Sequence, residues 1–249
     1  MSNLDLNTIA AQLEGLEETI IQKLIDRAQF AVNAAAYKPG MSGFSSAGDK
    51  SLFDLRLRYQ EEMDAAFGRF QVPEERPFHT DLPGSQRRVN LADSPLAPID
   101  LAVVSCTVQL VTDYLAYIPE LCAAGDDGQY GSSVEHDVLA IQAIARRVHF
   151  GSLYVAESKY REAPAEFDAL LARGDTDRLL EMLTRRDVED RIQRRVAEKV
   201  SYLQATVNPL VRTEISPETV LKLYRDTIIP LTKQGELRYL EARGVRPTA

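Results

Sequence analysis

The strongest constraint on the fold is a hydrophobic spacing of three and four residues that begins near the N-terminus. Apolar side chains recur in steps of four, three, four, four and four, at Ile9, Leu13, Leu16, Ile20, Leu24 and Ala28. Side chains with this spacing lie along one face of an α-helix, where they are buried together. The spacing predicts a long first helix over about residues 4–34.

Helical patterns also fill most of the remaining chain. They predict helices over about 51–68, 100–124, 133–160 with Ser133 as its cap, 164–172 and 175–183, another capped by Thr184, and a last one capped by Ser216 and kinked at Pro230. No segment shows the sustained alternation of a strand. We predict an all-α fold: a single helical domain over residues 1–249, with about 8 to 11 helices and no sheet. Glycines and prolines predict long surface loops at about 36–50 and 72–98.

The composition of the chain indicates which partners it binds and in which compartment it works. A formal charge of -8 argues against a nucleic-acid partner, and any anion must bind at a locally cationic site. Two cysteines are too few for a disulfide framework and suit a reducing compartment. We see no signal peptide, and the longest apolar stretch, Leu101–Val111, is shorter than the about 20 residues that span a membrane. We therefore expect a cytoplasmic protein with no membrane partner.

Charged residues on the predicted helices are ambiguous when each is taken alone. Arg146 and Arg147 lie in an apolar helix, which is one way to build an anion site, but paired arginines most often form a solvated helix face. Single residues such as Lys159, Glu189 and Glu236 most often lie on a surface. The three histidines lack metal-ligand spacing, so we expect no metal.

Four segments in a fixed order resolve this ambiguity. They are Leu16–Ile21, Ala145–Tyr160, Thr184–Glu189 and Ile229–Glu236. Together they resemble the all-helical chorismate mutases of the eukaryotic type, known from fungi and plants. The resemblance implies an isomerase of Phe and Tyr biosynthesis that converts chorismate to prephenate without a cofactor or covalent intermediate. Such an enzyme folds its dicarboxylate substrate and neutralises its charge.

The resemblance also implies a role for each matching residue. Arg147 matches the arginine that binds a substrate carboxylate, and Lys159 matches the lysine that bonds the ether oxygen and a carboxylate. Glu189 matches the acceptor of the ring hydroxyl. Thr232 and Glu236 match a pair four residues apart on one helix face. Because a carboxyl donates to the ether oxygen only when protonated, we expect a raised pKa at Glu236.

The sequence departs from the family at a cation on the first helix. The family has an arginine where this chain has Ala10, seven residues before the Glu-Glu-Thr-Ile-Ile motif. A substrate carboxylate without its cation would lose several kcal/mol unless another group replaces it. Arg185, one helical turn before Glu189, is our candidate for a substitute substrate-binding residue.

A second departure concerns helical register. Arg147 and Lys159 are twelve residues apart, whereas the family has eleven. One extra residue rotates a side chain by about 100° around an α-helix. A π-bulge near residues 152–154 would absorb that residue, and such bulges often occur at functional sites.

Family members bind aromatic amino acids at their dimer interface, so the resemblance also implies a homodimer and an effector site. Arg69, Gly131 and Ser132 match residues of that site. However, Gly68 replaces a basic residue, and Glu135 stands where a threonine is usual. A carboxylate beside the carboxylate of an amino acid argues against regulation by Tyr or Trp.

Two alternative functions remain open. Isochorismate carries the same two carboxylates, so the departures at Ala10 and in helix register are also consistent with an isochorismate mutase or pyruvate lyase. A non-catalytic helical dimer that binds an enzyme of the aromatic pathway is a third hypothesis. Retention of the five matching residues argues against it. Incubation with each acid distinguishes the three.

Overall fold

The regular structure of this chain is entirely helical in the computed structural model, which describes residues 4–244. The α-helices are α1 (Leu6–Arg27), α2 (Leu52–Ala66), α3 (Thr107–Leu121), α4 (Tyr130–Phe150), α5 (Ala156–Glu162), α6 (Pro164–Arg173), α7 (Thr176–Leu183), α8 (Arg186–Gln204), α9 (Pro217–Leu223) and α10 (Ile229–Gly244). Three 3-10 turns are η1 (Ala34–Tyr37), η2 (Arg69–Gln71) and η3 (Leu101–Val104), and two π-helical turns are η4 (Gly151–Val155) and η5 (Tyr224–Ile228). The all-α prediction is confirmed.

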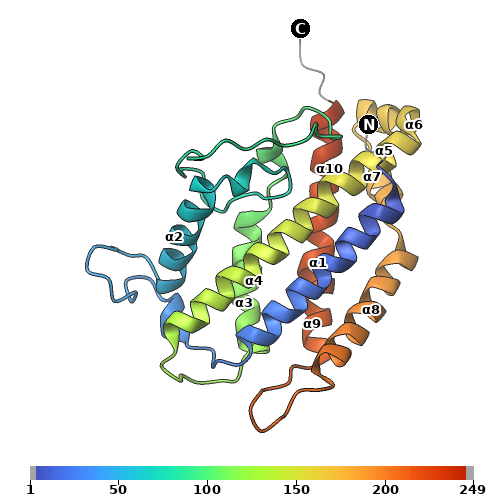
Figure 1. Ribbon diagram of the computed structural model, residues 1–249. Helices are drawn as coiled ribbons and strands as arrows, with labels where there is room; N and C mark the ends of the chain where they lie inside the picture. The colour runs from blue at the N-terminus through green and yellow to red at the C-terminus, as the bar shows by residue number, and fades with distance from the viewer. Residues whose placement is uncertain (1–3, 245–249) are drawn as a thin grey trace.

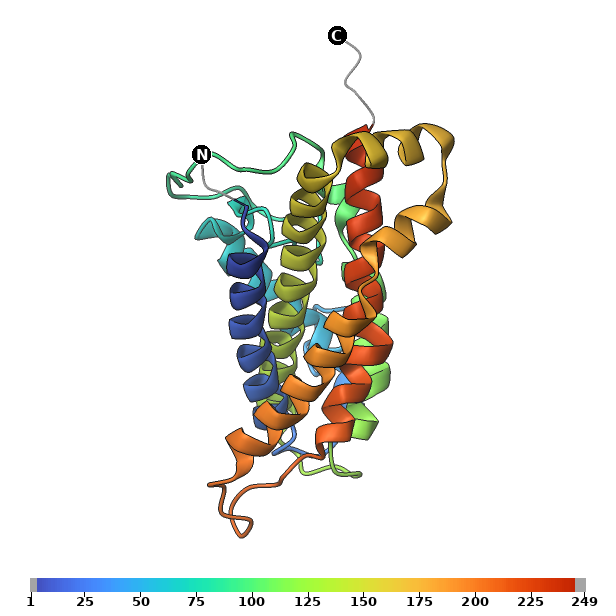
Figure 2. The same ribbon diagram turned by 90° about the vertical axis from the view of Figure 1, so that its right-hand side faces the viewer.

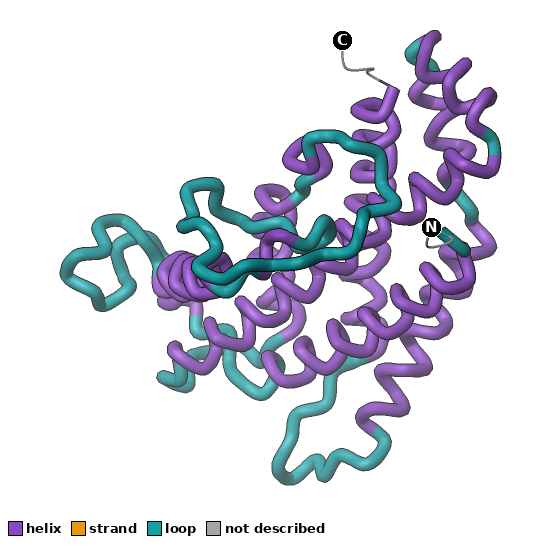
Figure 3. The backbone as a smooth tube through the Cα atoms, turned by 45° about the horizontal axis from the view of Figure 1, so that its top comes forward, coloured by secondary structure: helices purple, strands orange, loops and turns teal. Residues whose placement is uncertain are grey.

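The long helices run along one axis of the molecule (Figures 1 and 2). A continuous rod of α4, η4 and α5 lies between α1 and α10, and α8 packs against α1 and α9. The short helices α6 and α7 pack on each other and on α10 at one end of the bundle. Irregular segments join these elements at the surface, and the longest of them crosses the bundle beside α2 (Figure 3).

Burial of the predicted stripe holds α1 against the bundle. Ile20 and Leu24 are fully buried in the main core, together with residues of α3, α4, α8 and α9. Each such side chain contributes about 1.5–3 kcal/mol when it is removed from water. Leu13, on the same stripe, is only half-buried because it lines a pocket. A smaller second core joins α5, α6, α7 and α10.

The first helix ends earlier than the predicted residue 34. Its last residue, Arg27, is fully buried and forms an ion pair of 2.7 Å with Asp137 of α4. The Arg27 guanidinium also donates to the carbonyls of residues 30–32, which therefore fold back around it instead of continuing the helix. Asn33 then adopts a left-handed conformation with φ 52°. A residue in that conformation cannot extend a right-handed helix.

Two predicted helix starts are also wrong. Helix α4 begins at Tyr130, and the proposed cap Ser133 lies inside the helix, where its buried hydroxyl contacts Asn33 and the carbonyl of Gln129. Thr184 does not cap α8, which begins at Arg186 after the extended residue Arg185. The predicted cap at Ser216 is confirmed, since its hydroxyl accepts from the N–H of Glu218.

The predicted helix over 100–124 is divided into η3 and α3. Within residues 4–244, the segment Leu101–Leu121 is long and apolar enough to cross a membrane by length and composition, with a mean hydropathy of 1.5. This is longer than the stretch Leu101–Val111 on which the sequence argument rested. In the fold the chain breaks between η3 and α3, and α3 buries Leu110, Tyr114 and Ile118 in the main core. The core helix of a protein that binds no membrane can be as long and as apolar as this segment. Its composition therefore does not decide the question, and the absence of a membrane partner stays a prediction.

Both π-helical turns contact α10: η4 packs against it, and η5 leads directly into it. The π-bulge expected near residues 152–154 is confirmed by η4. Pro230, which has no N–H to donate, is the second residue of α10 and follows the second π turn, η5, after Ile229. Helix α10 packs closely on η4 because Gly235 faces Ser152, whose hydroxyl shares its one proton between the carbonyls of Val148 and Thr232.

Candidate active site

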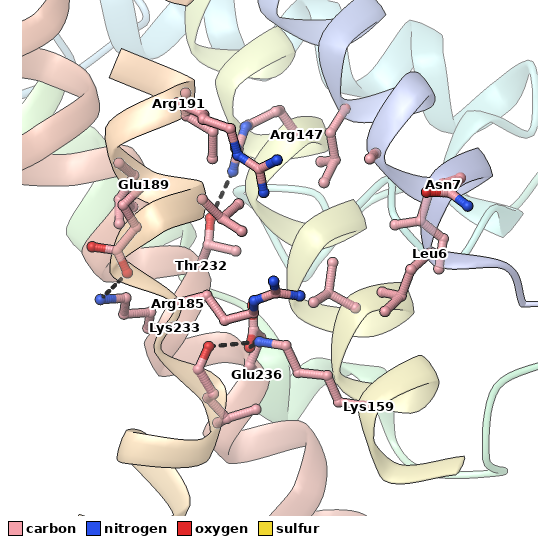
Figure 4. A pocket seen from close by; sticks show the side chains of 18 residues that line it. Leu6, Asn7, Arg147, Lys159, Arg185, Glu189, Arg191, Thr232, Lys233 and Glu236 are labelled. Atoms are coloured by element: carbon pink, nitrogen blue, oxygen red, sulfur yellow. Dashed lines mark hydrogen bonds and ion pairs between the residues drawn. The ribbon is translucent and has the colours of Figure 1, made fainter. Parts of the chain in front are cut away.

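A cavity of about 270 Å³ lies between α1, α8, α10 and the rod formed by α4 and α5. All six residues proposed to act on the substrate line it: Arg147, Lys159, Arg185, Glu189, Thr232 and Glu236. Figure 4 shows their side chains around one space. The other lining residues are Leu6, Asn7, Ile9, Ala10, Leu13, Val155, Leu183, Val188, Arg191, Ile192, Ile229 and Lys233. Residues far apart in the chain thus meet in one pocket.

The π-helical turn η4 brings Arg147 and Lys159 to the same pocket. In a regular α-helix, twelve residues would place the two side chains about 120° apart around the axis. A π turn takes in the extra residue, so the second half of the rod returns to the orientation that eleven residues would give. The departure in spacing is therefore compensated locally.

Arg147 is a buried cation with donors left for a ligand. Its side chain comes from the last turn of α4 and is 3% exposed. Its Nη1 donates to the Thr232 hydroxyl at 3.0 Å, and that hydroxyl donates to the Ile228 carbonyl. Its Nε is buried and has no hydrogen-bond partner among residues 4–244. A buried donor without a partner costs about 1–3 kcal/mol, which an anion in the pocket would relieve.

Lys159 and Glu236 form a pair on the pocket wall. The ammonium donates to Glu236 Oε2 at 3.1 Å and to the Leu183 carbonyl at 2.6 Å. Burial raises the pKa of Glu236 above its usual value, and the nearby cations, Lys159 foremost, offset only part of that rise. This rise agrees with the raised pKa that the sequence analysis expects at Glu236. A carboxyl with a raised pKa can hold a proton and donate it in a hydrogen bond.

Glu189 lies on α8 and pairs across the pocket mouth with Lys233 of α10 at 2.6 Å. Both side chains are partly exposed. Sequence reasoning missed Lys233 as a pocket residue, although it directly follows Thr232. This pair holds a carboxylate oxygen at the edge of the cavity, where it can accept a hydrogen bond from a ligand hydroxyl.

The pocket is strongly cationic although the protein is acidic. Five cations line it, and with the carboxylates Glu189 and Glu236 they leave a formal charge of +3; the cations are Arg147, Lys159, Arg185, Arg191 and Lys233. The whole chain carries -8. Such a local reversal of sign favours a small anion with more than one negative charge. Apolar residues of α1, with Ala10 among them, form the wall next to α8.

The three residues that match the family's effector site do not lie close together within one chain. Arg69 pairs with Asp64 and Glu75 and donates to Gln142 of α4. Gly131 and Ser132 belong to the first turn of α4, eleven residues before Gln142, which is about 16 Å along a helix. A site with all three would need residues from a second protomer.

Among residues 4–244, no three His, Cys, Asp or Glu side chains lie close enough together to hold a metal ion. His149 is fully buried, and burial lowers its pKa to about 3. Its Nε2 accepts from the N–H of Cys106 at 3.3 Å, so this histidine packs and bonds locally.

Comparison with known proteins points to one enzyme family, although no protein-family model matches the chain. The cytosolic chorismate mutase 2 of Zea mays is 32% identical over 250 residues, which cover 96% of this chain and 96% of that protein. The crystal structure of a chorismate mutase from Candida albicans, in complex with L-Trp, matches with a TM-score of 0.88 and 29% identity, covering 96% of this chain and 92% of that one. The crystal structure of the chloroplast chorismate mutase from Zea mays matches with a TM-score of 0.87 and 32% identity, and the match covers 97% of this chain and 96% of the chain in that structure.

Proposed function

Because the chain belongs to the all-helical chorismate mutase family of plants and fungi, we propose that the cationic pocket is where it converts chorismate to prephenate. The protein is a chorismate mutase, an isomerase of aromatic amino acid biosynthesis. The observation that carries the location of the site is the convergence of five cations and a buried carboxyl in one cavity.

The chemistry asks little of the protein beyond positioning and charge. Chorismate is a dicarboxylate with an allyl vinyl ether, and its rearrangement is one pericyclic step without a nucleophile. The protein accelerates it by holding the folded conformer and by stabilising negative charge that develops on the ether oxygen. Cations placed in advance around a partly enclosed pocket perform both tasks.

Arg147 binds one substrate carboxylate in this proposal. Its guanidinium is held by Thr232 on one side and keeps a buried Nε free of protein partners among residues 4–244. A planar guanidinium in that position offers two parallel donors to a carboxylate. Thr232 acts by orienting Arg147.

Lys159 and protonated Glu236 bond the ether oxygen in this proposal. Both groups are already in contact on the same wall, so a small shift lets each donate to one bridging oxygen. Glu189, fixed by Lys233, accepts from the ring hydroxyl. Arg185, at the start of α8, adds a positive charge at the same end as Lys159 (Figure 4).

The test is incubation of the purified protein with chorismate and, separately, with isochorismate, following the loss of ultraviolet absorbance and identifying the product. We expect chorismate to be converted to prephenate. Ala10 gives a specific reason to include isochorismate, and preferential consumption of that acid would overturn the proposed substrate. A folded protein inert toward both would instead support the non-catalytic helical dimer.

We propose that the protein acts as a homodimer. Helix α2 carries an exposed apolar row at four-residue spacing, with Tyr59, Met63 and Phe67 exposed by 55%, 51% and 68%. Such a row favours contact with a second copy. Sedimentation should give a dimer, and Met63→Lys should shift it toward monomer; a wild-type monomer at micromolar concentration would refute this proposal.

We propose that Tyr and Trp do not regulate this protein, although the Candida albicans relative was crystallised with L-Trp. Arg69 is already paired with two carboxylates, and one of them, Glu75, is largely buried. An amino acid carboxylate would have to displace them. We expect turnover to be insensitive to Tyr and Trp at millimolar concentration, and activation or inhibition by either would contradict this.

We also propose a cytoplasmic location, one domain over residues 1–249, and no nucleic-acid partner. The relatives include both a cytosolic and a chloroplast enzyme. Two free, buried cysteines and the net charge of -8 are consistent with the proposal. Imaging of a fluorescent fusion tests the location, and limited proteolysis tests the domain organisation.

A further inference from the structure

The wall of the pocket formed by α1 carries no cation among its lining residues. It consists of Leu6, Asn7, Ile9, Ala10 and Leu13. Helix α8, on the adjacent wall, presents a row at helical spacing that contains Val188, Arg191 and Ile192. Any positive charge at the level of Ala10 must therefore come from a neighbouring helix.

The register between α1 and α8 is fixed by ion pairs below the pocket. Arg195 lies 2.9 Å from Glu14 and 2.7 Å from Glu17. Lys199, four residues later, lies 2.9 Å from Glu18. Residue numbers increase together along the two helices, so α1 and α8 run in the same direction, as Figure 1 shows.

This register places Arg191 level with Ala10. Arg195 and Glu14 form an ion pair of 2.9 Å. Arg191 is four residues before Arg195, and Ala10 is four residues before Glu14. Both therefore lie one helical turn, about 6 Å, from that ion pair, toward the N-terminal ends of the two helices. Arg185 is ten residues before Arg195 and lies beyond this level. In Figure 4, Arg191 points into the pocket at the end that holds Arg147, and Arg185 at the end that holds Lys159 and Glu236.

We propose that Arg191 binds the second carboxylate of the substrate, and that it supplies from α8 the positive charge that α1 lacks at Ala10. This inference rests on the proposed function and assigns a substrate-binding residue within it. Arg147 holds one carboxylate and Arg191 the other, from two different helices.

The contacts of Arg191 leave its guanidinium available. Its side chain is 60% exposed, and its ion pair with Asp187, at 3.4 Å, also involves an exposed partner. Exposed pairs of this kind contribute about 0–1 kcal/mol. Arg185 contacts the same Asp187 at 3.5 Å. A carboxylate in the partly enclosed pocket competes well with so weak a partner, because Arg191 already lines that pocket.

The test measures the affinity of an oxabicyclic dicarboxylate analogue of the transition state by isothermal titration calorimetry. Arg191→Ala should weaken binding by about 10- to 100-fold, the range for a lost hydrogen bond to a charged group. Arg194→Ala, which removes an α8 cation outside the pocket, is the matched control and should bind as wild type does. The monocarboxylate form of the analogue, which lacks the group facing Arg191, should lose less than threefold in Arg191→Ala.

A second variant tests the register directly. Ala10→Arg, introduced into the Arg191→Ala protein, should recover at least about tenfold in affinity, because Ala10 is exposed and level with Arg191. Loss without recovery would overturn the claim that Arg191 serves the level of Ala10. Unchanged binding in Arg191→Ala, with Arg147→Ala impaired, would overturn the inference and leave the proposed function intact. A wild-type protein that neither turns over chorismate nor binds the analogue would overturn both.

Discussion

Lys159 Nζ donates to Glu236 Oε2 at 3.1 Å, across the space between α5 and α10. The two side chains come from segments that lie 77 residues apart in the chain. The packing of α10 on η4 joins them, through the small residues Gly151 and Gly235. The same contact places Thr232 beside Arg147. The close approach of α10 thus assembles two halves of the site at once.

The proton on Glu236 gives the first prediction. Burial raises its pKa, so the protonated, donating form is lost as pH rises through that raised value. We therefore expect kcat/KM to fall with increasing pH, and Glu236→Gln, which keeps a donor at every pH, to flatten the profile. The measurement is the pH dependence of chorismate turnover between about pH 5 and 8. A flat wild-type profile would show that Glu236 does not act as an acid.

Arg147→Ala should lower kcat/KM by about 100- to 1000-fold, since it removes a buried cation aimed at the substrate. Arg147→Lys should recover part of the loss, because an ammonium keeps the charge but not the planar pair of donors. Arg146→Ala is the control, because Arg146 is 45% exposed and contacts Glu74 and Glu75 outside the pocket. Equal effects of Arg146→Ala and Arg147→Ala would refute a special role for Arg147.

Thr232→Val tests whether Thr232 orients Arg147. The change keeps the volume but removes the oxygen that accepts from Nη1, so the guanidinium loses its fixed position. We expect kcat/KM to fall by about 5- to 10-fold, and the free energy of unfolding to fall by about 1–3 kcal/mol, because the buried Nη1 of Arg147 loses its acceptor. Thr232→Ser, which retains the hydroxyl, should stay within about threefold of wild type. If the valine and serine variants are equally active, the hydroxyl does not position Arg147.

Gly235→Ala tests the close packing of α10 on η4. An added Cβ would lie 2.6 Å from the Cβ of Ser152, which is fully buried and cannot move aside. Overpacking of this kind lowers the free energy of unfolding by about 1–3 kcal/mol. Gly15→Ala, where an added Cβ meets nothing within 4 Å, should stabilise α1 slightly. Urea unfolding of both variants measures the difference, and equal stabilities would contradict the packing argument.

The helices and the composition of the pocket were largely predictable, because both depend on local pattern. The stripe through Ile20 and Leu24 determines α1, and the twelve-residue spacing from Arg147 to Lys159 correctly predicted the π-helical turn. Matching motifs supplied the other pocket residues. Each of these predictions uses neighbours in the chain or one helix face.

Features that depend on distant residues were missed. The end of α1 at Arg27 depends on Asp137, which is 110 residues away, so no local pattern marks it. Arg191 is placed level with Ala10 only by the register that Arg195 sets with Glu14 of α1. Taken alone, Arg191 was one more arginine on a charged helix.

The proposed active site is tested most directly by a crystal structure of the protein with the dicarboxylate transition-state analogue bound. We predict that Arg147 contacts one carboxylate and Arg191 the other, while Lys159 and Glu236 meet the bridging oxygen of the analogue. An analogue bound outside the cavity between α1, α8 and α10, or bound inside it with Arg147 and Lys159 turned away, would show that this cavity is not the active site proposed for the enzyme.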